Sequence, residues 1–583
     1  MIIYGDAPRR VDPRAALDGV EGALHRLQPM PPGLERHAAL VSALIAAGEL
    51  AQGLADAEFA ARGKDSVSPG PDAAMALLAR LARAAWASWQ SGFARLSPPL
   101  RAEIAALRAA PMPAGVEAKR AEGFAYYALY PEAYALATTA LPEASWRVIG
   151  LRSIGTTLAA MAAAGLGAPV PRTLRPVGHP FRREMAVEEG LAADLIVPSP
   201  ARFALVDEGP GLSGSSLGAA IGFLQERGVA PGRIHLIPGH GGDPGPEADP
   251  RIRDLWSRVA RHPASFEDLL LHAGRPEHRL EGWAAALLGP AEAPLREISG
   301  GAWRSGPEEA WPPVHPFMER RKFLHRARGG TWLLKFAGLG AEGEAAAARA
   351  RALHEAGFTP PVAGFLHGFL VERWVEEGRP LDPAATDRAA LVSHLGRYLG
   401  FRARTMPAAP ESGATAEALW EMARANAREG LGEAAALGME RWKPLLPRLG
   451  AAIRRVHTDN RLHAWEWLVL PGGGLLKTDA VDHAASHDLI GCQDIAWDVA
   501  GAAAEFRLSA GERAALCGRV AQESGRAVDE ELLAFLTPCY LAFQLGYYSM
   551  AAGAWGGNAG EAARARAAAA RPAEALGRVL QQS

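Results

Sequence analysis

Residues 203–217 constrain the fold of this 583-residue chain more than any other stretch. A short apolar run ends in two adjacent carboxylates, Asp207 and Glu208. A turn rich in glycine and serine follows, and then an apolar pattern with helical spacing. This order predicts a strand, an acidic strand end, a phosphate-binding loop and a helix start, because the amide groups at a helix N-terminus bind anions. The acidic pair is placed to hold ribose hydroxyls or a magnesium ion.

The same stretch resembles the phosphoribosyl-pyrophosphate (PRPP) motif of type I phosphoribosyltransferases. The resemblance implies that Asp207 and Glu208 bind ribose and that PRPP and Mg²⁺ are the ligands. It also implies a 5′-phosphate site at Ser213, Gly214, Ser215 and Ser216. The sequence departs from the family pattern in two ways: the loop is one residue longer, and a glutamate stands where a second aspartate is commoner.

An earlier stretch, residues 146–158, repeats the strand–turn–helix pattern around a turn at residues 152–155. It resembles the pyrophosphate loop of the same family, which implies that Arg152, Ser153 and Gly155 hold pyrophosphate. An ordinary strand-to-helix connection is the alternative, and the alternating β/α pattern favours the functional interpretation. Four arginines in residues 172–184 suit either a flap that closes over pyrophosphate or a solvated basic loop. For His240 and Asp243 we favour a plain loop over a substrate contact.

Composition limits the partners. The hydrophobic content of 49% and charged content of 22% are ordinary for a globular protein. The net charge of −2 gives no general attraction to nucleic acid or to a membrane surface. The three cysteines form no CxxC pair, which argues against a disulfide framework and a zinc site and favours a reducing compartment. The first residues lack a signal-peptide pattern, and we find no apolar run long enough to span a membrane. We therefore expect a multidomain cytoplasmic protein of unspecified oligomeric state.

The C-terminal half carries a second set of signals. Residues 326–336 predict a hairpin with Lys335 late in its second strand, followed by an alanine-rich helix and an apolar strand at residues 368–375. This succession resembles the small lobe and hinge of the aminoglycoside-phosphotransferase/choline-kinase branch of the protein-kinase-like fold. The resemblance implies that Lys335 binds the ATP phosphates and that Glu344, or else Glu342, orients it through an ion pair.

Further along, His457-Thr458-Asp459 is similar to the catalytic loop of that family. The resemblance implies that Asp459 positions the acceptor hydroxyl or takes its proton, that Asp479 binds a metal ion, and that Asp498 is structural. The family usually has a metal-binding asparagine five residues after the catalytic aspartate, and Ala464 stands there. Three nearby residues could replace it: Asn460, His463 and Glu466. Of these, we assign the metal-binding role to Glu466.

The resulting fold class is an α/β multidomain protein. We expect a helical N-terminal region (1–115), a doubly wound parallel-sheet phosphoribosyltransferase-like domain (116–246), a helical or linker segment (247–310), and an α+β bilobal kinase-like domain (311–583). Strands are predicted to begin near residues 123–127.

The predicted function is a bifunctional transferase that combines phosphoribosyl transfer from PRPP with ATP-dependent phosphorylation of a small-molecule hydroxyl. The substrates would be nucleobase-like and hydroxyl-bearing small molecules, with no nucleic acid or membrane partner. One alternative is a nucleotide-sensing regulatory or defence protein with one or both halves degenerate. The other is a single working enzyme whose second half serves as scaffold.

Overall fold

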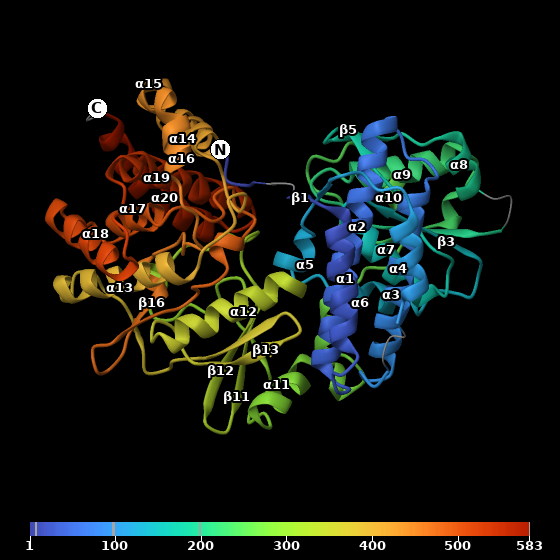
Figure 1. The fold of residues 1–583 in the computed structure, drawn as a ribbon, viewed down its shortest axis with the longest axis horizontal. Coiled ribbons are helices and arrows are strands. Elements are labelled where there is room, and N and C mark those ends of the chain that lie inside the picture. The colour runs from blue at the N-terminus through green and yellow to red at the C-terminus, as the bar shows by residue number, and fades with distance from the viewer. Residues whose placement is uncertain (6–8, 96–98, 197–199, 582–583) are drawn as a thin grey trace.

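The computed structural model describes residues 1–5, 9–95, 99–196 and 200–581, and it is a mixed α/β structure with several sheets. Figure 1 shows two halves side by side. The N-terminal helices and a parallel sheet form one half, and an antiparallel sheet with the C-terminal helices forms the other.

Four helices open the first half, as the sequence predicts. They are α1 (Pro13–Leu27), α2 (Leu34–Arg62), α3 (Pro69–Gln90) and α4 (Arg101–Ala109). Helix α2 is long and apolar enough to cross a membrane, but 67% of its most apolar window is buried inside the protein. It packs against α1, α3, α7 and α12, so its apolar surface belongs to the core. At its closest approach to α7, a Cβ on Gly48 would lie 1.8 Å from the hydroxyl of Thr157.

A five-stranded sheet of order β4-β3-β7-β8-β9 follows, and every neighbouring pair in it is parallel. Its strands are β3 (Trp146–Leu151), β4 (Arg172–Leu174), β7 (Arg202–Val206), β8 (Ile234–Ile237) and β9 (Ala260–Arg261). The helices along it are α7 (Gly155–Leu166), α8 (Glu189–Leu195), α9 (Ser215–Glu226) and α10 (Pro250–Ser257).

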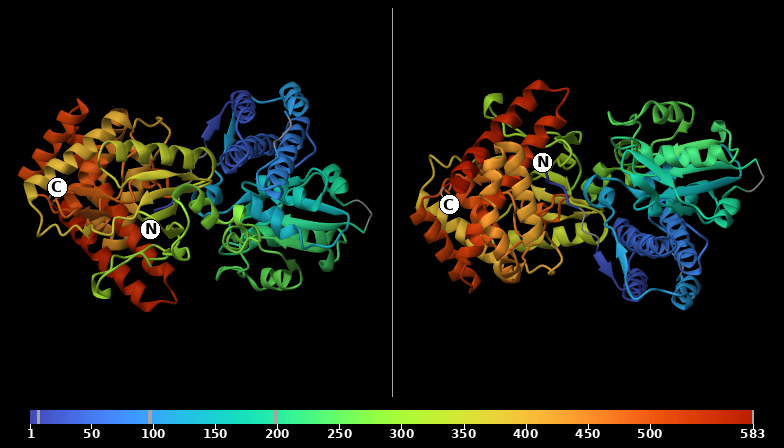
Figure 2. Two further views of the ribbon diagram at one scale, coloured as in Figure 1. Left: turned by 90° about the horizontal axis from the view of Figure 1, so that it is seen from below. Right: turned by 90° about the horizontal axis from the view of Figure 1, so that it is seen from above.

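Both faces of this sheet are covered. Along β7, Ala204 and Val206 join the core that contains α7, whereas Phe203 and Leu205 join the core that contains α9. This alternation is what a doubly wound sheet requires, because successive strand residues point to opposite faces. Figure 2 shows α1–α4 gathered on one side of the sheet.

One prediction is wrong here. Residues 123–127 do not begin a strand, because Glu122–Tyr126 form helix α5, and α6 (Pro131–Thr138) follows. A short antiparallel pair, β1 (Arg9–Val11) and β2 (Val116–Ala118), precedes them. A separate hairpin of β5 (Pro176–His179) and β6 (Arg182–Met185) packs against α9.

The second half begins with a five-stranded antiparallel sheet of order β10-β11-β12-β14-β13. The strands of this sheet are β10 (Arg296–Glu297), β11 (Lys322–Ala327), β12 (Gly330–Phe336), β13 (Val362–Leu366) and β14 (Phe369–Arg373). Helix α11 (Leu280–Leu288) precedes them in the chain, and α12 (Gly340–Glu355) connects β12 to β13. The hairpin, helix and strand predicted in this region are confirmed.

The remainder is mostly helical, with a small sheet of β15 (Arg379–Pro380), β16 (Trp467–Val469) and β17 (Leu475–Lys477). Its helices are α13 (Arg388–Thr405), α14 (Ala416–Leu431), α15 (Glu433–Leu437), α16 (Leu446–Ala452), α17 (Ala496–Glu505), α18 (Ala510–Ser524), α19 (Glu530–Ala554) and α20 (Ala559–Gln581).

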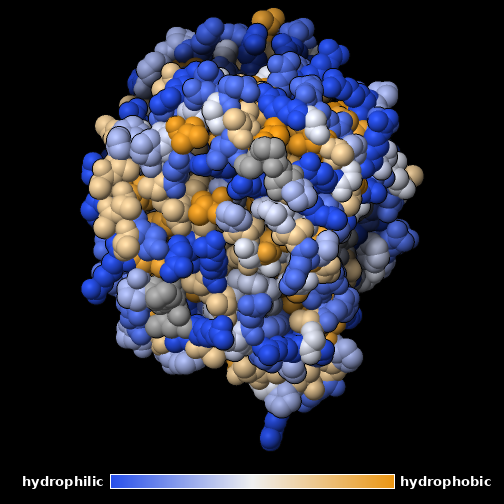
Figure 3. Space-filling view, turned by 90° about the vertical axis from the view of Figure 1, so that its right-hand side faces the viewer, coloured by the Kyte–Doolittle hydropathy of each residue, from blue (hydrophilic) through white to orange (hydrophobic). Residues whose placement is uncertain are grey.

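The cores do not follow the chain order. One core joins residues of α2 and α3 to Leu334 and Phe369 of the antiparallel sheet. Ile3, at the start of the chain, is fully buried in the core of the C-terminal helices, and its carbonyl accepts a hydrogen bond of 2.7 Å from the amide of Leu489. Figure 3 shows the face of the N-terminal half, where hydrophilic residues predominate and hydrophobic ones are scattered.

Candidate functional site

The predicted strand, loop and helix around Asp207 are present. Strand β7 ends at Val206, the two acids follow, and α9 starts at Ser215 after Gly214, whose φ of 64° is left-handed. The first predicted loop lies beside it, because β3 and β7 are parallel neighbours. A Cβ on Gly155 would lie 2.8 Å from the carbonyl oxygen of Val206. The fold therefore brings the two predicted phosphate loops together at one edge of the sheet.

The acidic pair is unusual electrostatically. Burial raises the pKa of Asp207 to about 7, although the amide of Glu208 donates to its carboxylate at 2.8 Å. Burial and the neighbouring Asp207 raise the pKa of Glu208 to about 8. Both residues are partly exposed. The main chain beneath is fixed, because the Tyr134 hydroxyl donates to the Asp207 carbonyl and the Gly239 amide to that of Glu208.

The serine loop is engaged with the β5–β6 hairpin. The hydroxyl of Ser215 donates to the carbonyl of Pro180 at 2.6 Å, and that of Ser213 lies 3.3 Å from the same oxygen. The two serine hydroxyls are also 3.0 Å apart. Ser213 and Ser215 are buried, whereas Ser216 in the first turn of α9 is partly exposed. The hairpin carbonyl therefore engages the hydroxyls of Ser213 and Ser215, two of the three serines that the resemblance assigns to a 5′-phosphate.

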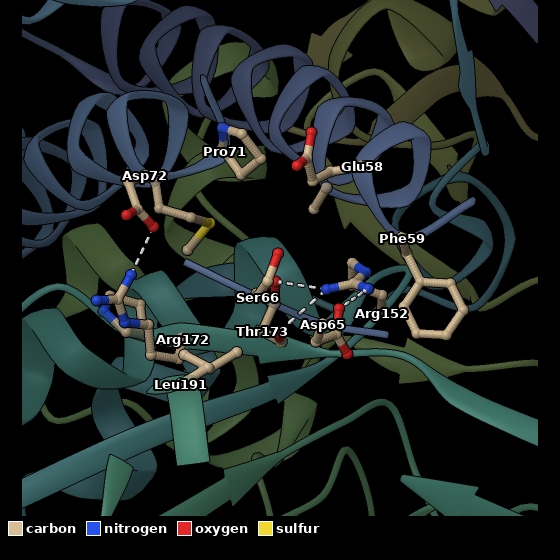
Figure 4. Close-up of a pocket in the computed structure, with 13 residues that line it drawn as sticks. Glu58, Phe59, Asp65, Ser66, Pro71, Asp72, Arg152, Arg172, Thr173 and Leu191 are labelled. Atoms are coloured by element: carbon tan, nitrogen blue, oxygen red, sulfur yellow. Dashed lines mark hydrogen bonds and ion pairs between the residues drawn. The ribbon is translucent and has the colours of Figure 1, made fainter. Parts of the chain in front are cut away.

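Arg152 does not face this loop with its side chain. Its guanidinium is buried and pairs with Asp56 of α2 at 2.8 Å and with Asp65, and it donates to Thr173 at 3.1 Å. Figure 4 shows it at a small pocket between α2, α3 and the sheet. The expectation that this side chain contacts pyrophosphate is therefore wrong, because the guanidinium pairs with Asp56 and Asp65 instead. The turn itself remains next to the end of β7, because a Cβ on Gly155 would lie 2.8 Å from the carbonyl oxygen of Val206.

The basic stretch after it is divided. Arg172 pairs with Asp72 and Asp194, and Arg175 pairs with Asp56. Arg182 and Arg183 lie at the hairpin, where Arg182 is exposed. His240 is exposed and Asp243 pairs with Arg261 at 2.7 Å, as a plain surface loop would have it.

In the second half, four predicted residues from separate segments meet. The ammonium of Lys335, on β12, pairs with Asp479. Asp459 and Glu466 converge from the loop before β16 on the ammonium of Lys477, at 3.5 and 2.8 Å. The sequence order of Lys335, Asp459, Glu466 and Asp479 therefore becomes a spatial cluster.

Asp459 is held rigidly. The carboxylate of Asp498 accepts the amides of Asp459 and Asn460 at 2.7 and 2.9 Å, which agrees with a structural role for Asp498. The hydroxyl of Tyr398 donates to Asp459. Burial alone would raise the pKa of Asp459, but the charges of Lys477 and Arg402 and the contact with His483 hold that pKa well below its ordinary value. Asp459 is therefore a carboxylate at neutral pH.

Metal ligands of the type Mg²⁺ prefers are present. The oxygens of Asp479 and Asp482 and a ring nitrogen of His483 lie within 4.8 Å of one another, as do ligand atoms of Asp459, Glu466 and His483. Carboxylate oxygens are the hard donors that Mg²⁺ takes. Lys335 pairs with both aspartates of the first set, at 3.0 Å for Asp482.

Of the three residues considered as replacements for the missing asparagine, the structure brings Glu466 to the cluster. Asn460 instead donates its side-chain amide to the carbonyl of Gly491 at 2.9 Å. His463 stacks on Trp465 and lies 3.3 Å from Glu505, facing away.

The expected Glu344–Lys335 ion pair does not form. Glu344 is exposed on α12, and Glu342 pairs with Arg120 at 2.9 Å. Glu372, on β14, interacts electrostatically with Lys335. Burial raises the pKa of Glu372 to about 7 and outweighs the charge of Lys335, which lowers that pKa.

The site also contains residues that the sequence interpretation missed. Asp482 and His483 stand only a few positions after Asp479, so their spacing was a usable signal. Lys477, Tyr398 and Arg402 carry no local signal, because each is recognised only by what the fold places opposite it.

A pocket of about 200 Å³ adjoins this cluster through the loop that carries Glu466. Trp465, the residue before Glu466, lines it together with Tyr540 and Tyr548. Glu505 also lines it and accepts from the hydroxyl of Tyr540 at 3.1 Å. Aromatic faces and a carboxylate can recognise an organic cation, and the guanidinium of Arg571 also lines the pocket.

No protein-family model matches the chain, and no curated protein matches it. Among solved structures, the chain is similar to LicA in complex with AMP, at 14% identity over 51% of this chain and 97% of that one, with a TM-score of 0.32. It is also similar to a choline/ethanolamine kinase family protein from Mesorhizobium loti, at 13% identity over 50% and 94% of the two chains, with a TM-score of 0.32. A spectinomycin phosphotransferase in complex with ADP and spectinomycin matches at 12% identity over 52% and 98%, with a TM-score of 0.35. Matches this distant carry no argument about activity, which has to rest on the geometry of the chain itself.

Proposed function

We propose that the C-terminal half is an ATP-dependent phosphotransferase acting on a small-molecule hydroxyl. The observation that carries this proposal is the convergence of Lys335, Asp459, Asp479 and Asp482 on one cluster between the antiparallel sheet and the C-terminal helices. Phosphoryl transfer needs a cation for the phosphates, carboxylates for magnesium and a carboxylate for the acceptor hydroxyl.

In this proposal each residue has a separate role. Lys335 binds phosphate oxygens, Asp479 and Asp482 hold Mg²⁺, and Asp459 orients the acceptor hydroxyl. Magnesium, when bound, neutralises charge on the phosphates. Because Lys477 and Arg402 keep Asp459 ionised, its main contribution is to position the hydroxyl rather than to remove its proton early.

The neighbouring pocket suits an acceptor that carries an amine. Trp465, Tyr540 and Tyr548 offer aromatic faces, and Glu505 stays ionised because His463 and Arg571 outweigh the effect of burial and lower its pKa. An amino alcohol would place its cation there and its hydroxyl toward Asp459.

For the N-terminal half we propose a Mg²⁺-dependent ribose-phosphate site of the PRPP type. The support is the adjacency of the Arg152–Gly155 turn to the Asp207–Glu208 pair at the carboxyl ends of two parallel strands, where open α/β sheets bind ligands. Transfer of the phosphoribosyl group to a nucleobase-like acceptor belongs to this proposal.

A sensing function without turnover is the second candidate, and two observations favour it. The ammonium of Lys477 fills the space between Asp459 and Glu466, where a second metal ion would otherwise be bound. In the other site, the carbonyl of Pro180 accepts hydrogen bonds from the hydroxyls of Ser213 and Ser215.

Phosphorus NMR of the full chain with Mg²⁺, ATP, PRPP and a pool of amino alcohols separates these functions. Loss of ATP with appearance of a phosphomonoester supports the kinase, and Asp459→Asn should abolish it while Asp382→Asn, an exposed aspartate of the same half, retains it. Binding of both ATP and PRPP with neither consumed supports the sensor. Equal ATP turnover in Asp459→Asn would refute the role given to Asp459.

A further inference from the structure

A buried cluster outside both sites joins the two halves of the molecule. The Nε2 atoms of His37, on α2, and His367, in the turn between β13 and β14, lie 2.9 and 2.8 Å from the same oxygen, Oε1 of Glu132 on α6. The exposed fractions of His37, Glu132 and His367 are 1%, 0% and 3%. Three residues far apart in sequence thus place three ligand-type atoms within 4.8 Å of one another.

The surroundings are apolar and aromatic. The ring of Phe93 lies 4.9 Å from that of His37, and the rings of Tyr130 and Trp283 lie 5.3 and 5.8 Å from that of His367. A charge in such a place is costly unless it is compensated locally.

Only one carboxylate oxygen of Glu132, Oε1, is engaged by the two histidines. Its second oxygen, Oε2, is buried and has no hydrogen-bond partner. Two further titratable groups, His278 and Tyr130, interact with the cluster, and Nε2 of His278 donates to the carbonyl of Trp89 at 2.8 Å. One carboxylate oxygen of Glu132 is therefore buried without a partner beside two histidine rings.

The donor set and its outer contacts fit a metal ion. Two imidazole nitrogens and a carboxylate are ligands that Zn²⁺ accepts in tetrahedral sites. A metal-bound histidine uses its other ring nitrogen to donate to a fixed oxygen, and Nδ1 of His37 lies 3.0 Å from the hydroxyl of Ser88. The turn that carries His367 is fixed as well, because the hydroxyl of Tyr130 donates to its carbonyl at 2.7 Å.

We propose that His37, Glu132 and His367 bind a divalent transition metal ion, with Zn²⁺ the best match, which fastens helices α2 and α6 to the antiparallel sheet. The sequence argued against a zinc site because the three cysteines form no CxxC pair, and the site proposed here uses histidine and glutamate instead of cysteine. The ion would engage the unpartnered oxygen of Glu132 and leave a fourth position for a small ligand or water.

The test begins with the full-length chain carrying Asp479→Asn, so that the kinase-like cluster does not contribute. After dialysis against a chelator, the protein is loaded with Zn²⁺ or Co²⁺, washed with excess Mg²⁺, and its metal content is measured by mass spectrometry. We expect about one Zn²⁺ per chain, a tetrahedral Co²⁺ absorption spectrum, and a higher melting temperature with Zn²⁺. A chain that retains no Zn²⁺ and gives only the spectrum of hydrated Co²⁺ would overturn the proposal, and this result needs no cluster variant to fold.

Variants in the same background locate the ion. His37→Gln and Glu132→Gln keep hydrogen-bonding groups of similar shape and should lose the bound metal. Ser88→Ala should weaken binding by about tenfold or more, because it removes the outer partner of His37. His325→Gln, a buried histidine of β11 outside the cluster, should bind as the parent does. Full metal retention in a folded Glu132→Gln protein would place the ion elsewhere and refute the assignment.

Discussion

Binding of a ribose phosphate at Asp207 and Glu208 should release protons. Burial raises the two pKa values to about 7 and about 8, so the empty site is partly protonated at neutral pH. Ribose hydroxyls and Mg²⁺ both favour the ionised carboxylates. A ligand that engages both acids must therefore displace the protons they carry.

The size of the effect follows from the two values. At about pH 7.5, Asp207 is about one-quarter protonated and Glu208 about three-quarters, so full engagement releases about one proton per ligand. The fraction of molecules with both acids ionised rises about twentyfold between about pH 7 and about pH 9, and affinity should rise with it. The stability of the empty protein has the opposite sign. Protonation of these acids stabilises it fully below about pH 4, and this contribution is lost as the pH rises through about 7 and 8.

Isothermal titration of the chain with ribose 5-phosphate and Mg²⁺, in buffers of different ionisation enthalpy, counts the protons directly. Asp207→Asn combined with Glu208→Gln should remove the proton release and most of the affinity. Asp243→Asn, an exposed acid of a neighbouring loop, should keep both. Tight binding without proton release in the parent protein, or an unchanged pH profile in the double variant, would refute the roles given to these carboxylates.

Two further predictions concern packing and loop positioning. Gly48→Ala should destabilise the fold by about 1–3 kcal/mol, because its Cβ would overlap the hydroxyl of Thr157. Gly19→Ala, in a helix with open space around that glycine, should be neutral or stabilising by up to about 1 kcal/mol. Thermal unfolding measures the effect of both substitutions. Equal melting temperatures for the two variants would contradict the packing argument. Asp498→Asn should remove a charge-assisted hydrogen bond worth about 1.5–3 kcal/mol from the loop of Asp459 and reduce ATP turnover, leaving ribose 5-phosphate binding intact. Loss of both activities would instead indicate global unfolding, which circular dichroism detects.

The parts of the structure that could be predicted from the sequence are those that depend on residues close together in the chain. The strand–acid–loop–helix segment around Asp207 depends on an apolar run, two acids and a glycine, and these lie next to one another in the chain. Lys335, Asp459 and Asp479 were identified from a resemblance to the aminoglycoside-phosphotransferase/choline-kinase branch, and the fold brings these three into one cluster.

The parts that failed depend on distant partners. Arg152 is in the predicted turn, but α2 supplies Asp56 and its neighbouring loop supplies Asp65, and these acids turn its side chain away. Glu344 is on the predicted helix, but on its exposed side, and the aspartates after β17 reach Lys335 instead. Residues 122–126 are helical although their aromatic content favours a strand, because burial against neighbouring elements outweighs local propensity.

Helix α2 bears on how the chain can be divided for experiment. With 29 residues it extends about 44 Å, and it carries His37 near one end and Asp56 near the other. The first lies in the cluster with Glu132 and His367, and the second pairs with Arg152 at the turn after β3. A fragment that contains either half alone would either lack this helix or expose the surface it covers. Expression of the separate halves should therefore yield aggregation-prone proteins, and co-expressed fragments should associate only when α2 is intact.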